Sequence, residues 1–236
     1  MRLTTTALLI LILVNSTSFA DLVMSSTDLT SPPTIDGDDA AYLGLGTNSS
    51  GNNGHLYSDR PAMGQTFTTG SNPGGYLFSS ATYRSGTFGG NSADSPPTFQ
   101  IQVGTISGSQ LTPIVPLIEF MEDSVQQHIR PNRHVTVEFD TPIQLSPNTL
   151  YGVDWWGGTS SYGIVLQQAS NSAFTGGQAY RSGSAHVGPD NSNLQFLDFD
   201  RAFHFDVTAV PEPSSFLLIG LVATVALGRR FLPKLV

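Results

Sequence analysis

The chain has 236 residues, contains no cysteine and carries a formal net charge of −8. The absence of cysteine excludes disulfides, thiolate nucleophiles and cysteine-based zinc sites. Residues 21–210 hold 17 acidic residues against six arginines and no lysine, a net charge of −11. Nucleic acid and anionic membrane surfaces are therefore poor partners for this part of the chain.

The first 20 residues have the pattern of a secretory signal peptide. Arg2 precedes an apolar run over residues 7–14, and Ser18 and Ala20 place small residues at the −3 and −1 positions of a cleavage site. The run is too short to span a bilayer, which favours a cleaved signal over a retained helix. We expect cleavage between Ala20 and Asp21, which leaves an extracytoplasmic domain over residues 21–209.

Residues 34–53 are rich in Gly, Asn and Asp and predict a long loop. Within it Asp36, Asp38 and Asp39 group carboxylates in the way that hard cations such as calcium require. An EF-hand loop counted from Asp36 would need Glu at its twelfth position, which is Thr47, so that motif fails. Calcium binding and a solvated acidic loop both stay open, and no other cofactor is expected.

Short stretches of alternating apolar and polar residues recur through the body and predict antiparallel strands. The clearest are 99–106 and 134–140, in each of which the odd-numbered apolar residues share one face. Further strands are expected at 64–69, 76–83, 150–156, 162–168, 177–181 and 194–207. Residues 119–130 are not a clear strand and are expected to hold at most a helical turn. Turn-forming clusters such as 70–75 and 146–148 separate them. Eight or nine strands in one domain predict an all-β antiparallel β-sandwich, with a jelly roll as the preferred topology.

Trp155 and Trp156 stand next to each other in one of these expected strands. Neighbouring strand residues point to opposite faces, so one tryptophan is expected in the core and the other at the surface or rim. An exposed tryptophan near Tyr151 or Tyr162 would be able to stack on the apolar face of a sugar ring. The alternative is that both tryptophans pack, one into the core and one beneath a loop.

The body shows no recognisable catalytic pattern. No two of its five histidines have the spacing of a zinc site, and there is no Gly-x-Ser-x-Gly elbow. Its glutamates, Glu119, Glu122 and Glu138, show no spacing that marks the carboxylate pair of a glycosidase. We expect a protein that is not an enzyme, with a glycan-active hydrolase as the least favoured alternative.

The last 27 residues combine a short polar motif, an apolar run and a basic stop. Residues 214–228 carry no charge, and as a helix they would measure about 22 Å, short of the ~30 Å hydrocarbon core. Arg229 and Arg230 follow this run, so the positive-inside rule places the C-terminus in the cytoplasm. The run lacks a polar face at helical spacing, which disfavours an ordinary helix of a soluble domain. The short length weakens the case for a permanent membrane anchor and favours a segment that is held in the membrane in transit.

The order Val210-Pro211-Glu212-Pro213, apolar run and Arg229-Arg230 resembles the PEP-CTERM sorting signal of Gram-negative bacteria. The resemblance covers residues 210–236. It implies recognition by exosortase, a membrane-embedded protease-like transpeptidase, with the protein held at the inner membrane before export to the cell surface or extracellular matrix. The body is more loosely similar to jelly-roll ectodomains that often carry this anchor, through the sequences at 64–67, 145–153 and 200–207.

Together these features predict an exported, non-catalytic surface or matrix protein that exosortase processes. The alternative is a carbohydrate-binding module of the extracellular polysaccharide, with calcium as an optional aid. Trp155, Trp156, Tyr151 and Tyr162 are its candidate sugar contacts.

Overall fold

The computed structural model describes residues 22–28, 52–55, 62–84, 99–120, 133–157, 165–167, 174–182 and 191–211. Thirteen strands lie in these ranges, every described strand pairing is antiparallel, and none of these residues is helical. The all-β, sandwich-like fold predicted from the alternation is therefore confirmed. The jelly-roll connectivity stays a prediction.

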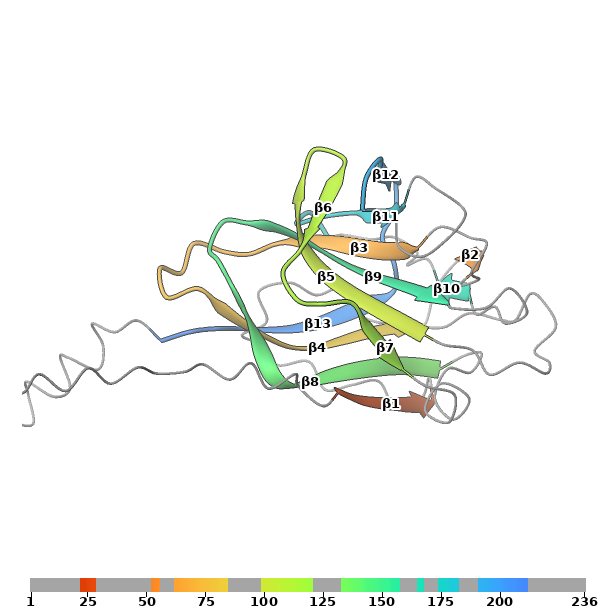
Figure 1. Ribbon diagram of the computed structural model, residues 1–236, viewed down its shortest axis with the longest axis horizontal. Helices are drawn as coiled ribbons and strands as arrows, with labels where there is room; N and C mark the ends of the chain where they lie inside the picture. The colour runs from red at the N-terminus through yellow and green to blue at the C-terminus, as the bar shows by residue number, and fades with distance from the viewer. Residues whose placement is uncertain are drawn as a thin grey trace, which may run out of the picture.

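The first sheet has four strands in the order β1-β8-β4-β13 and forms the lower layer of the molecule in Figure 1. Its strands are β1 (Leu22–Asp28), β8 (Arg133–Leu145), β4 (Tyr76–Arg84) and β13 (Phe203–Ala209). The pairing of β4 with β8 slips between Phe78 and Ser80. Pro142 lies in the stretch of β8 that this slip leaves out of the ladder, where its missing N–H costs no hydrogen bond.

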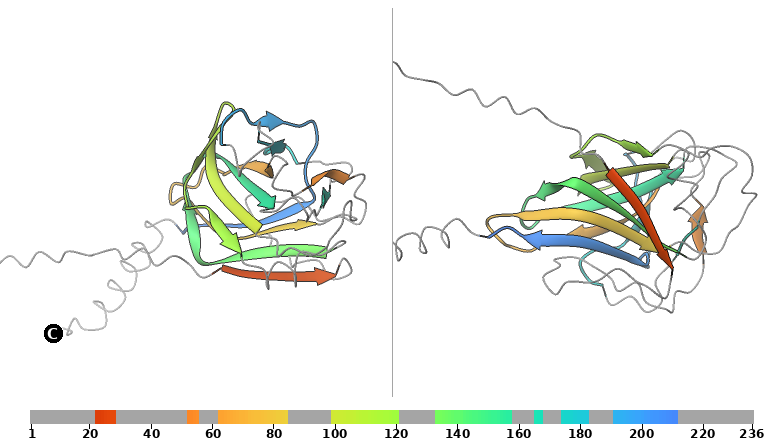
Figure 2. Two further views of the ribbon diagram at one scale, coloured as in Figure 1. Left: turned by 45° about the vertical axis from the view of Figure 1, so that its right-hand side comes forward. Right: turned by 90° about the horizontal axis from the view of Figure 1, so that it is seen from below.

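The second sheet follows the order β12-β11-β3-β9-β5-β6, with β7 also paired to β5. Its strands are β3 (Met63–Thr68), β5 (Phe99–Ser107), β6 (Gln110–Pro113), β7 (Ile118–Phe120), β9 (Leu150–Gly157), β11 (Ala179–Arg181) and β12 (Gln195–Phe196). A separate pair joins β10 (Val165–Gln167) to β2 (Asn52–His55). Figure 2 shows the two main sheets as stacked layers with the small pair to one side.

Aromatic side chains from both sheets fill the space between them. Phe67 of β3 lies 5.2 Å, between ring centroids, from Phe205 of β13. Trp155 of β9 meets Tyr83 of β4 edge-on at 4.5 Å and Phe99 of β5 at 4.9 Å. Such edge-to-face pairs add to the free energy gained by burying the rings. The predicted inward residues of β5 and β8 are all buried in this core: Phe99, Ile101, Val103, Val135, Val137 and Phe139.

The second sheet also buries part of its outer face, because its two edges curl toward each other. The N–H of Leu111, in β6, donates to the C=O of Asn191 at 2.8 Å, and the N–H of Leu194 donates to the C=O of Ser109 at 2.8 Å. A second apolar cluster lies within this curl and consists of Ile106, Leu111, Tyr180 and Leu194 with Leu150 and Phe196 packed against it.

Both ends of the described body lie at one end of the first sheet. β1 pairs antiparallel with β8, β8 with β4 and β4 with β13, so the start of β1 lies at the same end as the finish of β13. The connections from β3 to β4 and from β8 to β9 turn at this end, on the left of Figure 1. Thr69 joins them, because its Oγ1 donates to the C=O of Ser146 at 2.7 Å.

Several strands were not predicted. The alternation of apolar and polar residues did not predict β1, β6 or β7. β7, at Ile118–Phe120, overlaps the start of the region expected to hold a helical turn. β2 begins at Asn52, inside the predicted loop. The predicted signal peptide, with its cleavage site at Ala20 and Asp21, and the helix expected at 214–228 lie outside the described residues. Within the described ranges no helix is long and apolar enough to cross a membrane.

Candidate functional site

The folded body ends one residue before the predicted sorting motif. β13 finishes at Ala209, and the N–H of Val210 still donates to the C=O of Gly75 at 3.0 Å. The Nδ2 of Asn72 then donates both to the C=O of Gly75 at 2.8 Å and to the C=O of Val210 at 2.7 Å. Pro211 has no N–H and is exposed, so it continues neither the ladder nor the packing.

The turn that carries Asn72 is held in one conformation. Gly75 has φ of +77°, a left-handed geometry that side chains disfavour, and its N–H donates to the C=O of Asn72 at 2.9 Å. The N–H of Asn72 donates to the hydroxyl of Tyr76 at 3.1 Å. Hydrogen bonds to its backbone N–H and C=O therefore hold Asn72 in place, in addition to the two that its side chain donates.

Of the two alternatives for Trp155 and Trp156, the structure bears out the one in which both pack, and it leaves no open ring face for the sugar platform. Trp155 is 1% exposed and belongs to the core, as expected, but Trp156 on the other face is only 8% exposed. Tyr151 is 2% exposed, and its hydroxyl accepts the N–H of Ser146 at 2.8 Å, which is a structural role. A stacking platform needs an open ring face, and these three rings have none. Tyr162 lies outside the described residues.

The outer face of β9 instead buries polar groups. Asp154 is 2% exposed, and burial raises the pKa of its carboxyl from 3.8 to about 7. Gln102 lies directly opposite on β5 and is also buried. Tyr180 lies against Gly64 and Gly152, where added Cβ atoms would come within 2.6 Å and 2.8 Å of it. Its pKa is raised well above 10.0 by burial and, secondarily, by the Asp154 charge.

These outer-face groups are poorly hydrogen-bonded. The hydroxyl of Tyr180, the Oε1 of Gln102 and the Nε1 of Trp156 find no hydrogen-bond partner in the part of the chain that the structure describes. Burying such groups destabilises the folded state, because they lose their hydrogen bonds to water and gain none within the protein. The face is therefore a source of instability that the aromatic core offsets.

A second buried polar group lies where β3 meets the segment before β13. The Nε2 of Gln65 donates to a carboxylate oxygen of Asp200 at 2.7 Å, and its Oε1 accepts the N–H of Arg201 at 2.8 Å. Burial raises the pKa of Asp200 and lowers that of Arg201 to about 10. Arg201 also lies 5.3 Å from the ring centroid of Phe199. These hydrogen bonds join the two sheets and give both the nitrogen and the oxygen of the Gln65 side-chain amide a partner.

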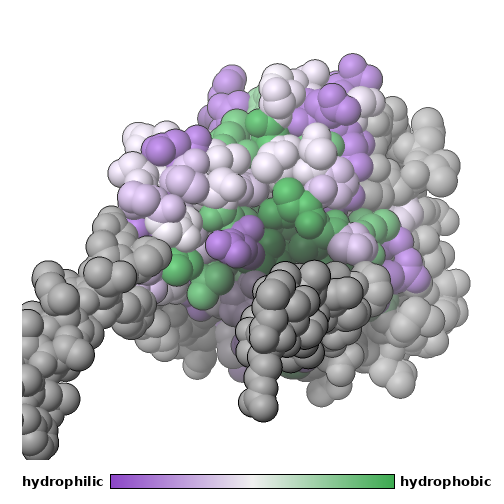
Figure 3. Space-filling view, turned by 60° about the vertical axis from the view of Figure 1, so that its left-hand side comes forward, coloured by the Kyte–Doolittle hydropathy of each residue, from purple (hydrophilic) through white to green (hydrophobic). Residues whose placement is uncertain are grey.

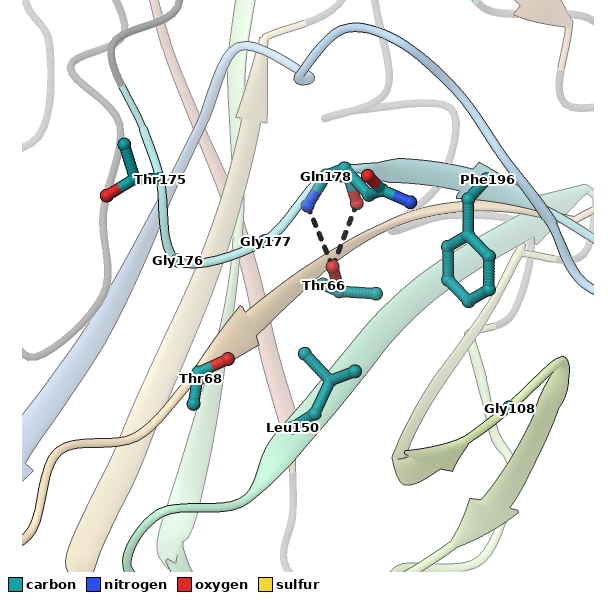
Figure 4. Close-up of a pocket in the computed structure, with 9 residues that line it drawn as sticks. All are labelled: Thr66, Thr68, Gly108, Leu150, Thr175, Gly176, Gly177, Gln178 and Phe196. Atoms are coloured by element: carbon teal, nitrogen blue, oxygen red, sulfur yellow. Dashed lines mark hydrogen bonds between the residues drawn. The ribbon is translucent and has the colours of Figure 1, made fainter.

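A groove of about 380 Å³ opens on the outer face of the second sheet. Figure 4 shows Thr68 and Leu150 rising from β3 and β9, with the 175–178 segment along one side and the ring of Phe196 at the other. The hydroxyl of Thr66 already has partners within the chain. Its Oγ1 accepts the N–H of Gln178 at 2.8 Å and donates to the C=O of Gln178 at 3.1 Å. No lining residue is charged. The groove thus offers one aromatic face, hydroxyls and an amide.

Cation binding at Asp36, Asp38 and Asp39 stays a prediction, because these residues lie outside the described ranges. Within those ranges no three His, Cys, Asp or Glu side chains come together in a way that would hold a metal ion.

The decisive comparison concerns the C-terminal segment. Residues 209–230 match the family model of the PEP-CTERM protein-sorting motif. The chain carries a PEP-CTERM sorting motif. This confirms the resemblance inferred from Pro211, Glu212, Pro213, Arg229 and Arg230, and the motif implies export, passage through the membrane and exosortase as the processing partner. No curated protein matched the sequence.

Sequence reasoning found the motif but missed the residues that hold its start. Asn72 was seen only as part of a turn-forming cluster, although Gly-Ser-Asn-Pro-Gly-Gly is the composition that such a turn needs. The contact of Asn72 with Val210 spans 138 residues, and no local pattern reveals it. The groove residues Phe196 and Gln178 were likewise expected only as parts of strands.

Proposed function

We propose that this protein is a non-catalytic, exported β-sandwich that PEP-CTERM sorting delivers to the cell surface or extracellular matrix of a Gram-negative bacterium. The match of residues 209–230 to the sorting motif is the observation that carries the proposal. The position of Pro211 supports it, since the residue is exposed two positions after β13 ends and is therefore accessible to a processing enzyme. The acidic, lysine-free body suits solubility outside the cell.

Replacement of Pro211, Glu212 and Pro213 with alanine tests this route. We expect the variant to accumulate unprocessed in the inner membrane, as shown by fractionation and by the mobility of the precursor. The matched control is Pro113→Ala with Pro116→Ala, which removes two exposed prolines from the body and should be processed normally. Normal release of the motif variant would refute exosortase-dependent sorting of this chain.

The second candidate function is binding of a neutral saccharide of the extracellular matrix. With both tryptophans buried, the groove over β3 and β9 is the observation that favours it. Its lining is uncharged and combines the ring of Phe196 with the exposed polar residues Thr68 and Gln178. Sugar sites pair an aromatic ring face with hydroxyl and amide hydrogen bonds in this way.

Phe196→Ala tests the saccharide groove. The variant should lose retention on a column of the host's extracellular polysaccharide, because the stacking surface is gone. Val23→Ala removes an exposed apolar side chain from β1 and serves as the control. Equal retention of the two variants and the native chain would exclude this groove as the binding site.

Calcium assistance at Asp36, Asp38 and Asp39 is tested separately. A ligand that binds only the folded state raises the melting temperature. We expect calcium to raise that temperature and EDTA to reverse the rise. A melting temperature that changes with neither calcium nor EDTA would contradict calcium binding and favour a solvated acidic loop.

A further inference from the structure

The last hydrogen bonds of the body hold Val210, which stands directly before Pro211, Glu212 and Pro213 of the sorting motif. Both backbone groups of Val210 are occupied, the N–H by Gly75 and the C=O by Asn72. Asn72 uses one side-chain nitrogen for two carbonyls, so the turn and the end of β13 are joined at a single atom. The exposed Pro211 therefore starts from a fixed point on the sandwich rather than from a loose linker.

The part of the sandwich end nearest this point, here called the uncharged end of the sandwich, is formed by residues 69–75, 146–149 and 208–211. None of these residues is acidic or basic, although the body as a whole is strongly acidic. Figure 3 views this end obliquely and shows white, pale purple and some deep purple residues around a hollow with apolar side chains. Such a surface meets another protein without the cost of burying unpaired charges.

The sequence keeps this end close to the membrane-directed segment. Only four chain steps separate Val210 from Ser214, where the uncharged run begins. At ~3.5 Å per residue these steps reach no farther than about 14 Å, whatever conformation they take. An enzyme that acts on the motif must therefore approach within that distance of the Asn72 turn.

We propose that the Asn72 turn positions the sorting motif and that the uncharged end of the sandwich is the surface that the processing enzyme contacts. The inference rests on the proposed sorting route and adds that the folded body is part of what the enzyme recognises. Asn72 acts through Val210 and is a positioning residue. The enzyme then receives a motif whose first residue is already fixed, which lowers the entropy cost of binding it.

Asn72→Asp in the full-length chain tests the positioning role. The substituted carboxylate cannot donate and would face two carbonyl oxygens, so Val210 should come free. Losing two hydrogen bonds should lower the fraction of chains in which the turn binds Val210 by about tenfold. The processing rate in a pulse-chase should fall by the same factor. Ser71→Asp is the matched control, because it places the same charge on the adjacent exposed residue and leaves Asn72 intact. It should be processed at close to the native rate.

Insertion of Gly-Ser-Gly-Ser between Val210 and Pro211 separates positioning from folding. This variant keeps every hydrogen bond of the turn, so the body in isolated membranes should resist protease as well as the native chain does. It should nevertheless be processed several-fold more slowly, because the enzyme loses contact with the sandwich. Native-rate processing of the insertion would overturn the proposal, even if Asn72→Asp misfolds. A slow insertion with native-rate Asn72→Asp would overturn the role of Asn72.

The alanine variant of Pro211, Glu212 and Pro213 is run alongside these chains. If it is released normally, the sorting route itself fails. If it is blocked while the insertion is processed at the native rate, the route stands and only the contact with the sandwich fails.

Discussion

The two faces of β9 are both buried but differ in their chemistry. The inner face carries Tyr151, Val153 and Trp155 into a continuous aromatic core, where the hydroxyl of Tyr83 donates to the C=O of Val153 at 2.8 Å. The outer face carries Asp154 and Trp156, which are also buried but lie among polar atoms without partners in the described ranges. The inner face of this strand thus stabilises the folded state, whereas the outer face offsets part of that stabilisation.

The difference shows that burial and stabilisation are separate properties of a residue. The inner face is buried because two sheets pack, and its contacts are mainly aromatic and apolar, although the Nε1 of Trp155 finds no partner in the described ranges. On the outer face, part of the burial arises because the second sheet curls until β6 and the 191–194 segment hydrogen-bond. Polar residues that suit an exposed face, such as Gln102 and Asp154, are then enclosed. Substitutions on the two faces should therefore change the free energy of unfolding in opposite directions.

The largest effect is expected on the inner face. Trp155→Ala removes a ring that contacts Tyr83 and Phe99 edge-on and should lower the free energy of unfolding by about 3–5 kcal/mol. Urea denaturation followed by circular dichroism measures this loss. Leu77→Ala, which truncates an exposed apolar residue of β4, is the control and should cost less than about 1 kcal/mol. Similar losses in the two variants would mean that the aromatic core does not dominate stability.

The next effect concerns Asp154 and depends on pH. Its carboxyl keeps a proton up to about pH 7 in the folded state but ionises near 3.8 when unfolded. Between these values the folded state binds more protons, so the free energy of unfolding falls as pH rises from about 4 to 7 and then levels off. A shift of this size corresponds to on the order of 4 kcal/mol. Asp154→Asn should remove the fall and be more stable than the native chain at pH 8.

The control for Asp154 is Asp28→Asn, which removes one negative charge from an exposed side chain that pairs with Arg133 at 3.3 Å. It accounts for the change in net charge together with the loss of one exposed ion pair. Denaturation curves at pH 5 and pH 8 give the comparison for both variants. If Asp154→Asn keeps the same loss of stability between these pH values as the native chain, then the buried carboxyl is not its source.

The sequence was sufficient for the inner face and insufficient for the outer one. Alternation in 99–106 and 134–140 correctly placed Phe99 and Val135 in the core, because strand periodicity is local. The same rule only places Trp155 and Trp156 on opposite faces, and it does not reveal that the outer face, with Trp156, is enclosed as well. The curl of the sheet depends on contacts between residues about 80 positions apart, such as Leu111 with Asn191. The hold of Asn72 on Val210 is equally long-range, whereas the sorting motif is contiguous and therefore readable.

The smallest effect comes from a pair of tyrosines, one for each face. Tyr83 reaches the backbone of β9 from the inner side and donates a hydrogen bond, whereas the hydroxyl of Tyr180 on the outer side has no partner in the described ranges. Tyr83→Phe should lower the free energy of unfolding by about 1 kcal/mol, and Tyr180→Phe should leave it unchanged or raise it by up to about 1 kcal/mol. Both substitutions remove a single oxygen from a fully buried ring, so each controls for the other. Equal losses in the two variants would show that the Tyr180 hydroxyl is hydrogen-bonded in solution, and the contrast between the two faces would then rest on Asp154, Gln102 and Trp156.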